Sequence, residues 1–88
     1  MFGKIEYENF VEVRLPQKAQ SAWDGALGSL VGATYKPLLY IGKQQVHGTN
    51  FFFIVEQTLI TNPPIRRLVK LVIHELDGEY KLASVEEI

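Results

Sequence analysis

Two histidines, His47 and His74, are the side chains most suited to acid–base or metal chemistry in this sequence. Glu75 follows His74 directly, but neighbouring residues of a strand point to opposite faces of a sheet, so the two cannot cooperate. The chain has no cysteine, and two histidines so far apart in sequence make a poor metal site. No nucleophile–base pair, phosphate-binding loop or pair of catalytic carboxylates can be assembled. The sequence therefore predicts a protein that is not an enzyme, with no metal site and no cofactor.

The segment with the clearest binding chemistry is Gln44–Gly48, which reads QQVHG. Its glycine permits the backbone angles of a tight hairpin turn, and its small or medium side chains allow the main chain to approach a narrow cleft. A loop held between two strands loses little entropy on docking. Two interpretations stay open, a binding loop and an ordinary hairpin turn. His47 within it is either solvated or paired with an acidic group of a partner.

Before this segment the pattern predicts one strand and one helix. Residues 4–15 alternate apolar and polar side chains, as a strand with one wet face does, with a bulge near Asn9 and Phe10. Residues 16–31 change to a helical period, beginning at a proline and ending before Gly32. The predicted helix side of the core consists of Trp23, Leu27 and Leu30.

After the helix no helical period returns, and four strands are expected. They cover residues 34–46, 49–61, 65–76 and 79–85, with a fraying tail at residues 86–88. Pro37 indicates an edge position or a bulge. Asp77-Gly78 is a two-residue hairpin signal of the type I′ class. Consecutive strands joined by short turns pair antiparallel, so the sequence predicts an α+β domain in which one helix crosses an antiparallel sheet of four to five strands.

Three smaller features carry their own expectations. Gly25 and Gly28 each cost about 1 kcal/mol of helix propensity relative to alanine, which suggests close packing against the helix backbone. The run Phe51–Phe53 covers both faces of its strand, so one or two rings are expected to stay partly exposed. Arg66 and Arg67 form a small basic cluster with Lys70, and this cluster is expected to be solvated, with a contact to a phosphate or an acidic partner as the alternative.

Length and charge limit the classes of function. Eighty-eight residues, 47% of them hydrophobic, predict a single globular domain over residues 1–88. Nine basic and ten acidic residues give a net charge of -1, which is not the basic footprint of a nucleic-acid-binding protein. No apolar run is long enough for a transmembrane helix, and no secretory signal pattern opens the chain. The expected location is the cytoplasm, with no membrane or nucleic-acid partner.

The residues Gln44, Val46 and Gly48, followed by Thr49-Asn50 and the phenylalanines, resemble the Q-x-V-x-G hairpin of the cystatin and stefin family. The order strand, helix, four strands is similar to that family over nearly the whole chain. The resemblance implies a cystatin-like fold and a wedge that enters the active-site cleft of papain-like cysteine proteases. The wedge would combine Gln44, Gln45, Val46, His47 and Gly48 with Gly3 and with the second hairpin, Asp77 and Gly78.

This chain departs from the family pattern at the second hairpin. The family carries Pro-Trp there, whereas residues 76–80 read LDGEY, and the single tryptophan lies on the predicted helix. Leu76 or Tyr80 would have to supply the missing apolar contact.

Two hypotheses about function remain, together with a third and remoter one. The first is a reversible, cleft-occluding inhibitor of papain-like cysteine proteases. The second is a non-inhibitory interaction or structural module on the same fold, with a homodimer through an edge strand as one form of it. The third is a small-ligand pocket between helix and sheet.

Overall fold

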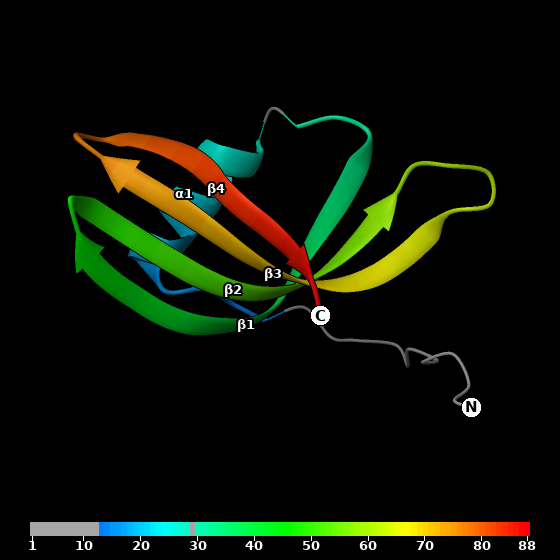
Figure 1. The fold of residues 1–88 in the computed structure, drawn as a ribbon, viewed down its shortest axis with the longest axis horizontal. Coiled ribbons are helices and arrows are strands. Elements are labelled where there is room, and N and C mark those ends of the chain that lie inside the picture. Colours follow the sequence, from blue (N-terminus) through cyan, green and yellow to red (C-terminus); the bar gives the residue numbers. More distant parts are fainter. Residues whose placement is uncertain (1–12, 29) are drawn as a thin grey trace.

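The structure is a computed structural model that describes residues 13–28 and 30–88. It contains one helix, α1 (Gln17–Leu27), followed by four strands, β1 (Ala33–Val46), β2 (Gly48–Leu59), β3 (Ile65–Leu76) and β4 (Glu79–Glu87). The strands form one antiparallel sheet in the order β1-β2-β3-β4, and α1 packs against β3 and β4 on one face of the sheet (Figure 1). The predicted α+β architecture is confirmed. The predicted strand over residues 4–15 lies almost wholly outside the described residues.

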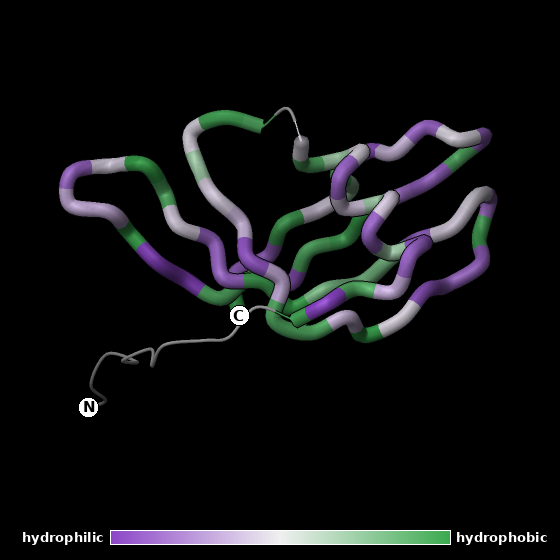
Figure 2. Tube along the Cα trace, turned by 180° about the vertical axis from the view of Figure 1, so that it is seen from behind, coloured by the Kyte–Doolittle hydropathy of each residue, from purple (hydrophilic) through white to green (hydrophobic). Residues whose placement is uncertain are grey.

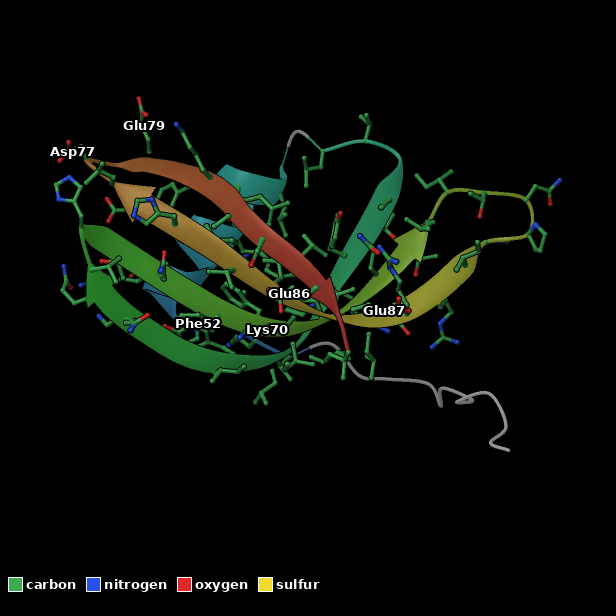
Figure 3. The ribbon with its side chains drawn as sticks, viewed as in Figure 1. Phe52, Lys70, Asp77, Glu79, Glu86 and Glu87 are labelled. Carbon is green, nitrogen blue, oxygen red and sulfur yellow. The ribbon has the colours of Figure 1, made fainter. Side chains whose placement is uncertain are left out.

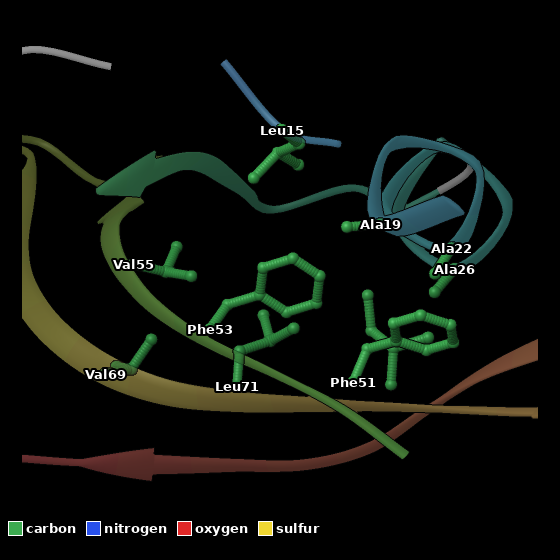
Figure 4. Packing of buried hydrophobic residues seen from close by; sticks show 10 residues of the cluster. Leu15, Ala19, Ala22, Ala26, Phe51, Phe53, Val55, Val69 and Leu71 are labelled. Carbon is green, nitrogen blue, oxygen red and sulfur yellow. The ribbon is translucent and has the colours of Figure 1, made fainter. Parts of the chain in front are cut away.

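The core lies between α1 and the inner face of the central strands. Three alanines on one side of the helix, Ala19, Ala22 and Ala26, let its backbone approach the sheet closely. Phe53 of β2 is fully buried opposite Leu71 of β3, and Leu15, just before the helix, closes one end of the cluster (Figure 4). Among the described residues, the buried cluster comprises Leu15, Ala19, Ala22, Ala26, Phe51, Phe53, Val55, Val69, Leu71 and Ile73.

The helix is shorter than its hydrophobic period suggests. It ends at Leu27, and Gly28 caps it by donating its amide to the carbonyl oxygen of Asp24 at 3.0 Å. The prediction that Leu30 belongs to the core is wrong, since its side chain is exposed. Figure 2 shows that the segment leading from α1 into β1 begins with hydrophobic residues. Gly32 is not the helix stop; it has φ +88° in that segment. Trp23 and Leu27 do pack against the core, although both stay partly exposed.

Close packing against the helix backbone occurs at Gly25. A Cβ atom placed there would lie 2.6 Å from Cδ2 of Tyr80, so the Tyr80 ring of β4 occupies the space that a side chain would need. Gly28 has a different role as the C-cap, where a Cβ atom would meet the carbonyl oxygen of Asp24 at 2.7 Å.

The edge strand β1 contains two irregularities. The register with β2 shifts between Pro37 and Leu39 and again between Tyr40 and Gly42, which confirms the bulge expected at the proline. The carbonyl oxygen of Pro37 accepts a hydrogen bond from the amide of Val13 at 3.0 Å. The chain preceding the helix is thereby attached to the free side of β1.

The phenylalanine run divides as expected. Phe51 and Phe53 are buried on the inner face, whereas Phe52 is partly exposed on the outer face. The ammonium group of Lys70 lies 5.7 Å from the centroid of the Phe52 ring, and Figure 3 shows the two side chains on neighbouring strands. This cation–π contact covers part of the exposed ring.

Arg66 and Lys70 of the basic cluster are exposed, as expected, but both arginines also form pairs that the sequence pattern does not predict. Arg66 donates two hydrogen bonds to Oε2 of Glu56, and the Glu56 residue is only 8% exposed. Arg67 donates to Oε1 of the buried Gln57 and lies 3.8 Å from a carboxylate oxygen of Glu87. These pairs depend on the register between β2 and β3, which a sequence pattern does not reveal.

The C-terminal end of β4 is also more ordered than predicted. The strand continues to Glu87, and the amide of Ile88 donates to the carbonyl oxygen of Leu68 at 3.1 Å, so residues 86–88 are not a fraying tail. The part of the chain that the structure describes contains no helix with the length and apolar character needed to span a bilayer.

Candidate functional site

The first hairpin turn is as tight as its sequence suggests. Val46 pairs with Gly48 in the sheet register, so His47 alone forms the tip between β1 and β2. The side-chain amide of Gln45 donates to the carbonyl oxygen of Gly48 at 3.1 Å and braces the turn from the β1 side. Gln44, Gln45, Val46 and His47 are all exposed. The turn therefore presents a narrow edge of backbone with short or flexible side chains.

Gly48 is required by both conformation and space. Its φ is +93°, a region that residues with a Cβ atom seldom adopt. A Cβ atom at this position would lie 2.2 Å from the carbonyl oxygen of Glu75 and 2.8 Å from Nε2 of His74. The glycine thus allows the first hairpin to lie directly against β3.

His74 connects the first hairpin to the third strand. Its Nε2 atom lies 2.7 Å from the carbonyl oxygen of His47. Because a carbonyl oxygen can only accept, Nε2 carries the proton of this hydrogen bond. The contact joins residues 27 positions apart and holds the tip of the turn from the β3 side.

The second turn lies at the same end of the sheet. Leu76 pairs with Glu79, and both turn residues, Asp77 and Gly78, have positive φ values of 52° and 82°, as the type I′ prediction requires. The amide of Gly78 donates to Oε2 of Glu75 at 2.9 Å, which fixes the turn to its own strand.

The two turns form one edge of the molecule. Thr49, next to the first turn, pairs with Glu75, next to the second, and Figure 1 shows both turns at one end of the sheet with the β2–β3 turn at the other. The end that carries the β1–β2 and β3–β4 turns is here called the double-turn edge. The topology thus brings Gln44–Gly48 together with Asp77 and Gly78. Gly3, the third predicted component, lies outside the described residues.

The side chains of the double-turn edge at the second turn are mostly polar or charged. Figure 3 shows Asp77 and Glu79 projecting from this end, and with Lys81 they line a shallow hollow next to His74. Of the two residues expected to replace the missing Pro-Trp contact, Tyr80 packs against Gly25 but stays partly exposed, and it lines a hollow with Gln45 and Thr49 beside the first turn. Leu76 is partly exposed and lines the hollow next to His74, so it is the apolar group that the second turn offers.

His74 and Glu75 do not face each other, and the described residues contain no metal-binding cluster. His74 pairs with Asn50 across the sheet and Glu75 with Thr49, so the two neighbours occupy opposite faces. Within residues 13–28 and 30–88, no three histidine, cysteine, aspartate or glutamate side chains gather closely enough to hold a metal ion. The double-turn edge offers surface shape and polar contacts.

One feature of the site was missed by sequence reasoning: the His74 contact with the first turn, which depends on the register of β2 with β3. A hollow at the C-terminal end of α1, between the helix and β1, lies where the third hypothesis expects a pocket between helix and sheet. Its walls include Tyr35 and Trp23, which the sequence predicts only as a core residue.

Comparisons with protein-family models, with curated proteins and with solved structures find no match to this chain. The double-turn edge must therefore be interpreted from its own geometry and from the sequence resemblance.

Proposed function

We propose that this protein is a reversible inhibitor of papain-like cysteine proteases that binds by inserting its double-turn edge into the active-site cleft. The main support is the contact between Nε2 of His74 and the carbonyl oxygen of His47, which holds the exposed Gln44–Gly48 turn beside the second turn. A wedge that is ordered before binding loses little conformational entropy when it docks. The inhibitor would occlude the cleft without forming a covalent bond.

The role that we propose for each residue of the two turns follows from how exposed its side chain is. Gln45, Val46 and the backbone around His47 would contact the cleft walls, because they form the narrow tip of the first turn. Leu76 would supply an apolar contact from the second turn. Because this contact is smaller than a tryptophan, the expected affinity is micromolar at best, about -8 kcal/mol.

A second function is favoured by the composition of the second turn. Asp77 and Glu79 place two carboxylates where an apolar contact would strengthen insertion into a protease cleft. This observation supports a non-inhibitory interaction module on the same fold. A partner with a basic surface would suit the double-turn edge in that case.

An inhibition assay with papain separates the two functions. Wild-type protein should inhibit with a constant near or above about 1 μM, whereas Val46→Arg should weaken inhibition at least about tenfold. Ile65→Arg is the matched control, because Ile65 is an exposed β-branched residue next to the opposite turn. Gly48 is unsuitable for this test, since any side chain there would collide with β3. Absence of inhibition by the wild-type protein at about 100 μM would exclude the inhibitor and leave the interaction module.

A further inference from the structure

A second hollow lies away from the double-turn edge, between the C-terminal end of α1 and the start of β1. It measures about 280 Å³, and its walls include Trp23, Asp24 and Leu27 of the helix and Thr34 and Tyr35 of the strand. This size is near the lower end of pockets that hold small molecules. The hollow is here called the helix-end cleft.

The charge of the cleft comes from its helix side. Among the described residues that line it, Asp24 of α1 is the only ionisable group besides the phenol of Tyr35, and β1 contributes no charged side chain. Oδ1 of Asp24 accepts a hydrogen bond from the Gln20 amide at 2.9 Å, and among the described residues nothing pairs with Oδ2. The cleft also lies at the C-terminal end of a helix, where the macrodipole is negative, and the last turn of α1 contains no basic residue.

Both aromatic walls are held in place by other contacts. Trp23 packs on Phe53 at a centroid distance of 5.3 Å and an angle of 68°, while part of its surface stays exposed. The Tyr35 hydroxyl accepts a hydrogen bond from the Gln57 amide at 3.1 Å, and Gln57 in turn accepts one from Arg67. These interactions fix two aromatic rings at the cleft before any ligand arrives.

Aromatic surfaces combined with a carboxylate and a helix C-terminus attract cations that are weakly hydrated. We propose that the helix-end cleft binds a small organic cation of the quaternary ammonium class. The aromatic rings of Trp23 and Tyr35 contact the alkyl groups around the charge, and Asp24 neutralises it from the rim. The site is independent of the proposed inhibitory function. It lies between the end of α1 and the start of β1, away from the double-turn edge, and shares no residue with that edge.

The test uses choline as the cation and 3,3-dimethylbutan-1-ol as its neutral isostere. Trp23 is the only tryptophan, so its indole N–H gives a single reporter signal in a nitrogen–proton NMR spectrum. At constant ionic strength, choline should shift this signal saturably with a dissociation constant of about 1 mM, and the alcohol should bind at least about tenfold more weakly. No saturable shift with choline, or equal binding of the alcohol, would overturn the proposal.

Variants locate the binding site. Asp24→Asn keeps the size of the side chain and should weaken choline binding about fivefold to tenfold, while Tyr35→Leu should weaken it about tenfold. Asp77→Asn is the matched control, since it removes the same charge from the second turn, which contributes no residue to the helix-end cleft, and should leave binding unchanged. The backbone signals of each variant report whether it is folded. An equal loss with Asp24→Asn and Asp77→Asn would mean unspecific charge attraction and would also overturn the proposal.

Discussion

The imidazole of His74 on β3 holds the carbonyl oxygen of His47 at the tip of the first hairpin, with 2.7 Å between Nε2 and the oxygen. The bond uses the side chain of one histidine and the backbone of the other. The two histidines are therefore not equivalent, although both lie at the same edge of the sheet. Substitutions that remove each imidazole separately can distinguish their roles.

His74→Phe should destabilise the protein by about 1 kcal/mol, the usual net value of one hydrogen bond. It should also speed amide hydrogen exchange at residues 47 and 48, because the tip loses its attachment to β3. His47→Ala is the matched control, since it leaves the accepting carbonyl in place and should change stability by less than about 0.5 kcal/mol. Urea unfolding and hydrogen exchange measure both effects. An equal loss in the two variants would contradict the assigned roles.

Gly48→Ala should be much more costly than Gly32→Ala. Both glycines have φ values near +90°, but a Cβ atom at Gly32 would meet nothing within 4 Å, whereas at Gly48 it would approach the Glu75 carbonyl oxygen to 2.2 Å. Gly32→Ala should therefore cost only the backbone strain, about 1–2 kcal/mol. Gly48→Ala adds a collision with the backbone of β3, for a total above about 3 kcal/mol.

Chemical denaturation of the two alanine variants gives this comparison directly. The native spectrum of Gly32→Ala should remain close to that of the wild type, while Gly48→Ala should shift signals on β3 as well as on the hairpin. Similar losses of stability in both variants would show that the first turn does not pack on β3 as described.

Short-range chemistry explains what the sequence predicted well. Asp77-Gly78 specifies its turn through two residues that tolerate positive φ, and Pro37 specifies a bulge through its missing amide hydrogen. The helix end was misplaced because apolar spacing continues to Leu30 after the chain has left the helix at Gly28. Periodicity reports which side chains are apolar, but it does not report where the backbone stops making helical hydrogen bonds.

The contacts that could not be predicted from the sequence depend on pairing between residues far apart in the chain. The order of the strands predicted that two turns share one edge, since alternate turns of a meander open at the same end. The contact of His74 with His47 and the ion pair of Arg66 with Glu56 require the register of β2 with its neighbours, which no local pattern fixes. The same holds for the helix-end cleft, whose walls come from α1 and β1.

We expect the free energy of unfolding to fall at alkaline pH because of Tyr40. Burial raises the pKa of its phenol above the usual value of about 10, because desolvation disfavours the phenolate. The folded state therefore holds the phenol proton more tightly than the unfolded state, so the stabilisation is complete below pH 10 and is lost as pH rises through the folded-state pKa. Tyr40→Phe should weaken this alkaline decline in unfolding free energy. If the Tyr40→Phe variant lost as much stability at alkaline pH as the wild type, the loss would arise from other groups.

Gly25 and Tyr80 make the most direct test of how helix and sheet approach each other. Gly25→Ala gains about 1 kcal/mol of helix propensity, but its Cβ atom would lie 2.6 Å from the Tyr80 ring. Displacing a packed ring costs about 1–3 kcal/mol, so the single substitution should destabilise the protein. In a Tyr80→Ala background the ring is gone and only the Cβ atom of residue 80 remains, 3.1 Å from the new methyl group, so the same Gly25→Ala change should stabilise by somewhat less than about 1 kcal/mol.

A double-mutant cycle measured by urea unfolding reports this reversal of sign. The coupling free energy between the two positions should lie within about 1–3 kcal/mol, the range for residues in direct contact. Ser21→Ala, at an exposed helix position one turn earlier, is the control and should show no coupling to Tyr80→Ala. If Gly25→Ala stabilised the protein with the tyrosine still present, α1 would not pack against β4 at this point, and the close approach that Gly25 permits would be wrong.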